Sequence, residues 1–346
     1  MPHPAERPAA PQSACAFCGY RTSTAPVQTP SGASCCSEQC RTAYENDEQP
    51  FTEGVDYKWF SPGVSVLDSL LPQGIPANSF VLLAGVEGIR HRGLQTELVW
   101  RTLTREEPAI IVTFVDPAVA IVEHFLTFGW NVLPFLEAGD LHIIDCFTSR
   151  LRDEHQTPKH QAAWNEFLGR FLDGSVTVIE EPSNLRAMED ALHSRLEAAE
   201  MIGQGIVIID SLNEVERQGQ ETETNQFIKE VRGDICSRKF VPIFASATTT
   251  ERGRIEKENT YLFDGIVEMR RNESLIEGVR LKQLSVRKMD GVLYHPDWIA
   301  YENATGSGFQ MFDPVADLTT VYGTLSQSDQ PATQPERSPP RRRPTR

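Results

Sequence analysis

Short apolar runs alternate with longer amphipathic stretches through the middle of the chain. Between positions 185 and 199 the apolar residues recur every three or four positions, which predicts an amphipathic helix. Strands that alternate with helices form parallel βαβ units covered on both faces, so an α/β fold is predicted. The runs with the length of buried strands are residues 80–84, 109–114, 141–145, 176–179, 206–210 and 240–245.

The end of this segment has a different pattern. Apolar stretches follow one another at closer spacing there, and no helix pattern separates them. Hairpins at one edge of the sheet are therefore predicted. The stretches concerned are residues 265–269, 281–287, 292–295 and 309–312.

Composition divides the chain into segments. Residues 15–46 hold five of the seven cysteines in Pro-, Ser- and Thr-rich surroundings, and residues 55–314 carry the α/β pattern. Residues 1–14 and the Arg- and Pro-rich residues 315–346 lack apolar periodicity, so both are predicted to be disordered. We expect a small cysteine module followed by one large domain.

The net charge is −15, which argues against a broad nucleic-acid-binding surface because phosphate contacts need Lys and Arg. Arg far outnumbers Lys and acidic residues are abundant, as in proteins of a salt-rich cytoplasm, although a GC-rich genome gives a similar Arg bias. Residues 1–12 lack the apolar core of a signal peptide, and no apolar run could cross a bilayer. We expect a cytoplasmic protein without membrane insertion.

The first strand leads into a turn and a helix where a P-loop would lie. A working P-loop reads G-x-x-x-x-G-K-[ST]: its backbone N–H groups and its Lys hold phosphates, and its hydroxyl holds Mg²⁺. Gly85 matches the first glycine, and Gly88 adds another within the turn. The later key positions have no glycine, lysine or hydroxyl; they are Arg90, His91 and Arg92.

Residues 64–76 (VSVLDSLLPQGIP), just before this turn, resemble the "G-L-D-x-L-L-G-G-G-I-P" segment that precedes the P-loop in the KaiC-like family of RecA-type ATPases. The matching segments follow the family's order: 64–76 (VSVLDSLLPQGIP), 108–114 (PAIIVTF), 124–132 (HFLTFGWNV), 139–145 (GDLHIID), 264–267 (DGIV) and 286–291 (VRKMDG). The resemblance implies a RecA-like P-loop NTPase sandwich, with a mostly parallel central sheet and edge hairpins. A haloarchaeal paralogue would fit the composition.

The resemblance also implies which residues occupy the family's catalytic positions. Residues 206–211 (IVIIDS) look like a Walker B strand with Asp210 as its metal-orienting carboxylate, although Asp210 could simply cap the next turn. The family's pair of glutamates corresponds to Val115 and Asp116; valine cannot accept a proton, and Asp116 is expected to cap the turn before Pro117.

A further catalytic position lies near the end of the domain. Family members send a Lys-x-Arg pair from a neighbouring subunit towards the γ-phosphate, and the match here is Lys288 followed by Asp290. A carboxylate at the arginine position would repel phosphate. Asp116 and Lys288 are therefore interpreted as vestiges, and no residue is predicted to be catalytic.

Nucleotide binding without hydrolysis stays open. Positive charge at a helix N-terminus favours an anion, so a weak site is predicted from Gly85, Gly88, Arg90, His91, Arg92 and Asp210. Alternatively the three basic residues are solvated loop residues, and the nearby Glu87 would weaken an anion site.

The cysteine segment has the spacing of a metal site. The pattern C-x-x-C-G, a gap, and C-x-x-x-C followed by an aromatic residue resembles small treble-clef-like modules. That resemblance assigns the ligands to Cys15, Cys18, Cys36 and Cys40, with Cys35 as an alternative. Zn²⁺ in a structural role is expected, and a soft-metal sensor is the alternative. Cys146 and Cys236 are expected in the core.

These features predict a catalytically impaired KaiC-like protein that acts as a regulatory or signalling interaction protein. A divergent ATP-binding protein or ATPase is the enzyme alternative, and a nucleic-acid-associated RecA-like protein is a third. The expected cofactor is Zn²⁺; ATP remains open and Mg²⁺ is not expected. A protein partner is expected, a homo-oligomer remains open, and nucleic acid is not an expected partner.

Overall fold

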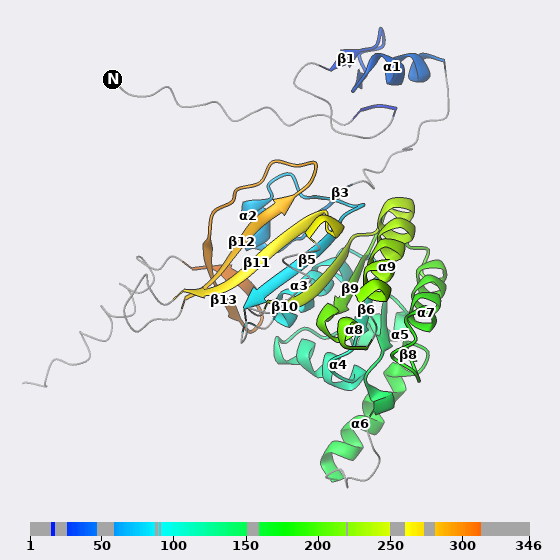
Figure 1. Ribbon diagram of the computed structural model, residues 1–346, viewed down its shortest axis with the longest axis vertical. Helices are drawn as coiled ribbons and strands as arrows, with labels where there is room; N and C mark the ends of the chain where they lie inside the picture. The colour runs from blue at the N-terminus through cyan, green and yellow to red at the C-terminus, as the bar shows by residue number, and fades with distance from the viewer. Residues whose placement is uncertain are drawn as a thin grey trace, which may run out of the picture. The chain divides into compact units, whose positions relative to one another are not determined.

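The main element of the computed structural model is a ten-stranded sheet (Figure 1). The structure describes residues 15–17, 26–46, 59–86, 89, 91–150, 159–218, 221–249, 260–272 and 281–312. Across the sheet the strands are β14 (Gly308–Met311), β13 (Ile299–Ala304), β12 (Leu281–Met289), β11 (Gly265–Asn272), β5 (Phe80–Val86), β10 (Ile243–Thr249), β9 (Ile206–Asp210), β6 (Ala109–Thr113), β7 (Leu141–Asp145) and β8 (Val176–Val178).

The strands from β11 to β8 all pair in parallel. The strands from β11 to β14 pair antiparallel and form the other end of the sheet. Both the mostly parallel sheet and the edge hairpins predicted from the spacing of apolar runs are therefore confirmed. This arrangement brings the carboxyl ends of β5, β10, β9 and β6 side by side.

Helices cover both faces of the sheet because the central strands are apolar on both faces. Side chains such as Val81 and Leu83 point to one face, where they join one apolar core; Phe80 and Leu82 point to the other. The first core contains α2 (Ser65–Leu70), α3 (Arg92–Leu103), α4 (Ala118–Thr127), α5 (Leu133–Ala138) and α6 (Lys159–Leu172). The second contains α7 (Leu185–Ala198), α8 (Leu212–Gln218) and α9 (Glu221–Val231), which continues as a π-helical segment (Arg232–Ser237).

Smaller elements lie outside the ten-stranded sheet. Before β5, a two-stranded ladder joins β3 (Trp59–Phe60) to β4 (Ile75–Pro76). The cysteine segment forms a hairpin of β1 (Val27–Gln28) and β2 (Ser34–Cys35), followed by α1 (Glu38–Glu45). Short 3₁₀ turns span Thr148–Arg150 and Thr260–Leu262. The segments predicted to be disordered, 1–14 and 315–346, lie outside the described residues.

Two strand predictions are wrong in detail. The run 240–245 begins its strand only at Ile243, because Phe240 has φ +53° and Pro242 has no backbone N–H to pair. Residues 292–295 form no strand, and Leu293 is 76 % exposed. On the side away from β11, β12 pairs with β13, a six-residue strand whose Glu302 and Asn303 interrupt its apolar pattern.

A buried carboxylate fixes the last hairpin to α3. The Glu97 side chain is fully buried, accepts the Phe309 backbone N–H at 2.6 Å and pairs with Arg101 at 2.9 Å. Burial raises the pKa of Glu97. Gly308 has φ +75°, and a side-chain carbon there would overlap the Glu97 carboxylate, so glycine is required on both counts.

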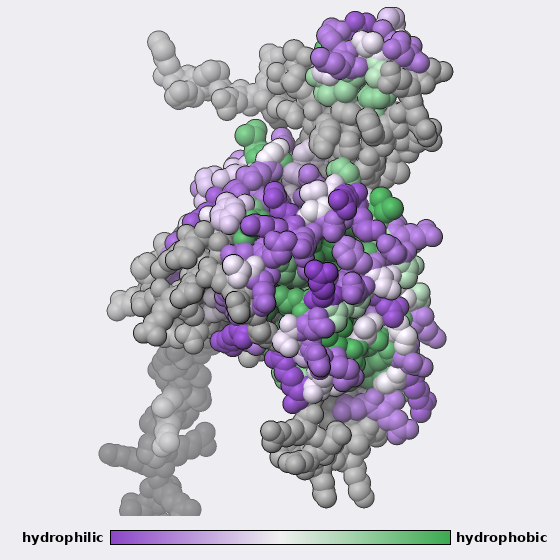
Figure 2. Space-filling model, turned by 45° about the vertical axis from the view of Figure 1, so that its right-hand side comes forward, coloured by the Kyte–Doolittle hydropathy of each residue, from purple (hydrophilic) through white to green (hydrophobic). Residues whose placement is uncertain are grey.

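The exposed face drawn in Figure 2 is mostly hydrophilic, and its apolar side chains form small groups between polar ones. A face of this kind offers no extended apolar patch for a partner. Among the described residues, every helix is too short or too polar to cross a membrane.

Candidate functional site

A cavity of about 730 Å³ lies where the central parallel strands end. Residues from the ends of β9 and β10, from the loop after β6, and from the starts of α3 and α8 line it. In an open α/β sheet this is the edge at which ligands bind, because loops and helix N-termini converge there. The lining residues are Ile89, His91, Arg92, Val115, Asp116, His124, Asp210, Ser211, Asn213, Glu214, Arg217, Ser246 and Thr248.

His91, at the lysine position of the P-loop pattern, turns back over the end of β5. A side-chain carbon on Gly85 would overlap the His91 imidazole, so only glycine allows this approach. His91 is 6 % exposed, and its Nε2 has no hydrogen-bond partner among the described residues. Burial lowers the pKa of His91 to about 4, although Asp210 acts in the opposite direction. The imidazole is therefore neutral at pH 7, and the alternative of a solvated loop residue is wrong for this position.

Arg92, at the hydroxyl position of the P-loop pattern, is the first residue of α3. One terminal nitrogen of its guanidinium pairs with Asp116, and the other lies 3.1 Å from Asp210 Oδ2. Asp210 Oδ1 accepts the Ser246 hydroxyl at 2.8 Å. Both oxygens of the carboxylate at the Walker B position are thus engaged by groups of the same chain, and no backbone N–H of the described residues bonds to it.

Asp116 does not cap the turn before Pro117, so that expectation is wrong. The first N–H of α4, on Ala118, instead bonds Asp145 Oδ2 at 2.8 Å. Asp145 is the last residue of β7 and pairs with Thr113, the last residue of β6. This position brings the Asp145 carboxylate within hydrogen-bonding distance of the start of α4. The Asp116 side chain is left to pair with Arg92. Its neighbour Val115 lines the cavity and is 38 % exposed.

The opposite wall of the cavity is held by polar contacts within the chain. The Asn213 side chain accepts the Thr248 N–H at 2.7 Å and donates to the Thr248 carbonyl at 3.3 Å, which joins α8 to the end of β10. Glu214 pairs with Arg217 and lies 3.9 Å from Arg150. Ser246 and Asn213 are not among the residues singled out from the sequence; the signal for Ser246 is that it directly follows the apolar run 240–245, whereas Asn213 lies at the start of α8 and has no such signal.

Lys288 lies on the antiparallel part of the sheet, away from the carboxyl ends of the central parallel strands. It sits on β12 beside Ile266, which pairs with Leu82 rather than with the carboxyl end of β5. The Lys288 ammonium donates to the Phe263 carbonyl at 2.6 Å and lies 3.1 Å from Asp290. Within one chain it therefore does not contribute to the cavity.

Some predicted site residues lie outside the described residues: Gly88, Arg90 and Cys18. The described part of the predicted anion site contributes little net positive charge, because His91 is neutral at pH 7 and Arg92 faces two carboxylates. Binding of a nucleotide at these residues stays a prediction.

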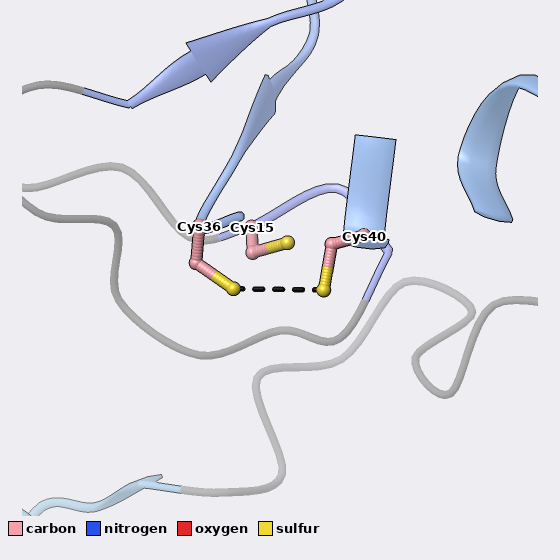
Figure 3. A group of neighbouring side chains, drawn as sticks. All are labelled: Cys15, Cys36 and Cys40. Atoms are coloured by element: carbon pink, nitrogen blue, oxygen red, sulfur yellow. Dashed lines mark hydrogen bonds between the residues drawn. The ribbon is translucent and has the colours of Figure 1, made fainter. Parts of the chain in front are cut away.

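Three cysteines of the N-terminal segment converge (Figure 3). The sulfurs of Cys15, Cys36 and Cys40 all lie within 4.8 Å of one another, and Cys36 and Cys40 are 3.6 Å apart. Zn²⁺ with tetrahedral Zn–S bonds of about 2.3 Å holds its sulfurs about 3.8 Å apart. The three thiols thus have the spacing of a metal site, to which Cys18 would add the fourth ligand.

The local fold explains why Cys36 and not Cys35 belongs to this group. Cys35 ends β2 opposite Val27 and is fully buried in a small apolar cluster with Phe17. Cys36 follows the strand, and Cys40 lies in the first turn of α1, which Ser37 caps by accepting the Cys40 N–H at 3.2 Å. Cys146 and Cys236 are buried in the core, as expected, and burial raises the pKa of Cys146 to about 12.

Comparison with known proteins agrees with the fold. A profile described as "ATPase: KaiC" matches residues 60–314. A "UPF0273 protein" of Thermotoga maritima is 24 % identical over 232 residues, which are 66 % of this chain and 86 % of that relative. UPF0273 protein PH0284 of Pyrococcus horikoshii is 24 % identical over 230 residues, 66 % of this chain and 84 % of the relative.

A solved structure shows the same architecture. The crystal structure of KaiC-like protein PH0186 from Pyrococcus horikoshii OT3 superposes with a TM-score of 0.56, covering 74 % of this chain and 99 % of that chain at 15 % identity. The fold, the order of the motifs and the family profile all point the same way. The chain therefore belongs to the KaiC family of RecA-like ATPase domains.

Proposed function

We propose that this KaiC-family chain does not hydrolyse ATP by the family's mechanism and acts instead as a regulatory interaction protein. The observation that carries the proposal is the state of Arg92, which occupies the P-loop hydroxyl position and pairs with Asp116 and Asp210. Both carboxylates near the expected phosphate position, those of Asp116 and Asp210, therefore form ion pairs with a cation of the same chain.

Two further positions support the loss of hydrolysis. Val115 stands where a general base would activate water, and an aliphatic side chain cannot accept a proton. His91 stands where a lysine would neutralise phosphate, and it is uncharged at pH 7. The losses affect proton transfer, charge neutralisation and metal binding, so no single replacement group restores the chemistry.

The residues present do not fit Mg²⁺. Mg²⁺ requires oxygen ligands in near-octahedral geometry, and it is usually held by one or two carboxylates together with phosphates. Here both carboxylates face the Arg92 guanidinium, and the P-loop hydroxyl is missing.

A divergent nucleotide-binding protein is the second candidate, and the cavity itself favours it. Its volume of about 730 Å³ falls within the range of small-molecule sites, roughly 300–1,000 Å³. Under this candidate a nucleotide would bind without a divalent cation, and its binding would be read out as a signal.

The cysteine segment supports an interaction role. A structural zinc site would give residues 15–46 a folded surface that their apolar content alone cannot stabilise. We assign the protein partner to this folded surface.

Phosphate release by the zinc-loaded chain, measured with Mg²⁺ and ATP beside an Asp210→Asn variant, tests the loss of hydrolysis. We expect equal, background rates from both proteins. A rate that the wild type shows and Asp210→Asn loses would overturn the proposal.

For the interaction role, a purified binding partner should lose affinity for Cys40→Ser and keep it for Asp210→Asn.

A further inference from the structure

The Arg92 guanidinium lies between the carboxylates of Asp116 and Asp210, where a divalent cation would otherwise bind. We propose that Arg92 is a built-in substitute for that cation, and that Asp116 and Asp210 become a divalent-metal site only when Arg92 is removed. The inference rests on the proposed function and specifies the ligands of the same cavity: any ligand it accepts is one that carries no divalent metal.

The geometry gives each carboxylate its own nitrogen. Asp116 follows β6 and Asp210 ends β9, and these strands are direct neighbours in the sheet. The two terminal nitrogens of Arg92 reach one carboxylate each, as a single cation between two anions would. Ser246, from β10 on the other side of β9, adds a hydroxyl at 2.8 Å from Asp210.

The donor set without Arg92 suits a hard cation. Two carboxylates and one hydroxyl are oxygen ligands, which Mg²⁺ and Mn²⁺ prefer. With Arg92 in place a metal ion would meet a positive charge and carboxylates already bonded to it. The side chains are only partly exposed, 26 % for Arg92 and 13 % for Asp210, so water screens this repulsion incompletely.

The position of Arg92 on its helix shows that the carboxylates hold it there. A cation in the first turn of α3 faces the positive end of the helix dipole, which is unfavourable. The Arg92 Nε is buried and has no hydrogen-bond partner among the described residues. Its stabilising contacts are thus the two ion pairs, the same ones that exclude a metal.

The test is a titration with Mn²⁺ alone, without nucleotide, followed by the electron paramagnetic resonance of unbound Mn²⁺. The proteins are the full-length wild type, Asp210→Asn, Arg92→Ser and Arg92→Ser/Asp210→Asn, all loaded with zinc beforehand because thiolates prefer the softer metal. We expect Arg92→Ser to gain one Mn²⁺ site at least about tenfold tighter than any in the wild type, and the double variant to lose it.

Two results would overturn the inference. One is a Mn²⁺ site in the wild type that Asp210→Asn removes, since Arg92 would then not exclude the metal. The other is the absence of any gain in a folded Arg92→Ser chain. Should Arg92→Ser fail to fold, Arg92→Gln, a shorter neutral side chain that can still donate hydrogen bonds, is held to the same expectation, and the comparison of wild type with Asp210→Asn stands by itself.

The outcome separates this inference from the proposed function. A metal-binding wild type that still releases no phosphate overturns the role of Arg92 and leaves the loss of hydrolysis, through Val115, in place. Phosphate release that depends on Asp210 overturns the proposed function whatever the Mn²⁺ titration shows.

Discussion

The cavity of the core and the cysteine cluster (Cys15, Cys36 and Cys40) both gather side chains that bind cations, but they differ in what completes them. In the cavity the carboxylates of Asp116 and Asp210 face a cation of the chain itself, Arg92. In the cysteine cluster three sulfurs lie within 4.8 Å of one another, at the spacing of a tetrahedral metal site.

The two sites also differ in what holds their side chains in place. An acidic pair keeps its place in the fold when a neighbouring side chain supplies the positive charge, so the Walker B strand can persist without the metal. A thiol cluster in a short segment has no core to replace the metal. We therefore expect changes at the two sites to differ greatly in size.

The largest expected effect is at the cysteine cluster. Cys36→Ser, Cys40→Ser or Cys18→Ser should abolish the proposed zinc binding and unfold residues 26–46, because metal binding supplies about 10 kcal/mol or more of folding free energy in such modules. Zinc content per chain and amide hydrogen exchange of this segment measure the effect.

The matched control is Cys35→Ala, whose sulfur lies outside the cluster. It should keep one zinc per chain. Stoichiometric zinc in Cys18→Ser would remove Cys18 from the ligand set, and loss of zinc in Cys35→Ala would assign it to Cys35.

A smaller effect is expected where α3 holds the last hairpin. Glu97→Ala leaves the Phe309 N–H and Arg101 without their buried acceptor, so the free energy of unfolding should fall by about 3 kcal/mol. Glu97→Gln keeps a carbonyl oxygen as acceptor and should cost about 1 kcal/mol. Equal losses in urea unfolding of the two variants would mean that the charge, rather than the hydrogen bond to Phe309, fixes the hairpin.

Removing the internal cation comes next. Arg92→Met leaves two carboxylates facing each other without compensation, and we expect a loss of about 2 kcal/mol at pH 7. Arg92→Lys retains the charge but cannot give each carboxylate a separate fixed nitrogen, so about 1 kcal/mol should be lost. Unchanged stability in Arg92→Met would show that the two ion pairs contribute nothing to the fold.

The smallest expected effect depends on pH. Burial, reinforced by Glu230, Asp190 and Asp234 against Arg186, raises the pKa of Glu189 to about 7. Because the folded state then binds the proton more tightly than the unfolded chain, stability is full below about pH 4.5 and falls as the pH rises towards 7. Glu189→Gln should remove this slope and raise stability at pH 8 by about 1 kcal/mol, a value reduced for partial exposure.

The control for this prediction is Glu197→Gln, on the exposed side of the same helix. It should retain the slope in chemical unfolding measured from pH 4 to 8. A wild-type chain whose stability rises between pH 5 and 7 more steeply than that of Glu189→Gln would contradict the sign.

The fold was largely predictable because buried parallel strands such as β9 are continuous apolar runs and are bounded by polar residues. The strand β13 was not predicted because its pairing with β12 and β14, rather than an apolar pattern, defines it. Its Glu302 and Asn303 pair with residues of β14. At the site, the positions of His91 and Asp210 followed from the motif order. The bridge formed by Arg92 did not, since it joins residues distant in sequence that only the neighbouring strand ends bring together.

Calorimetric titration of the zinc-loaded chain with ATP, with and without Mg²⁺, beside Arg92→Ser and Asp210→Asn, decides whether Arg92 takes the place of the metal. The account predicts that Mg²⁺ does not increase the affinity of the wild type for ATP and that an increase appears in Arg92→Ser. Binding of ATP that is tighter with Mg²⁺ in the wild type, and that Asp210→Asn weakens, would contradict it.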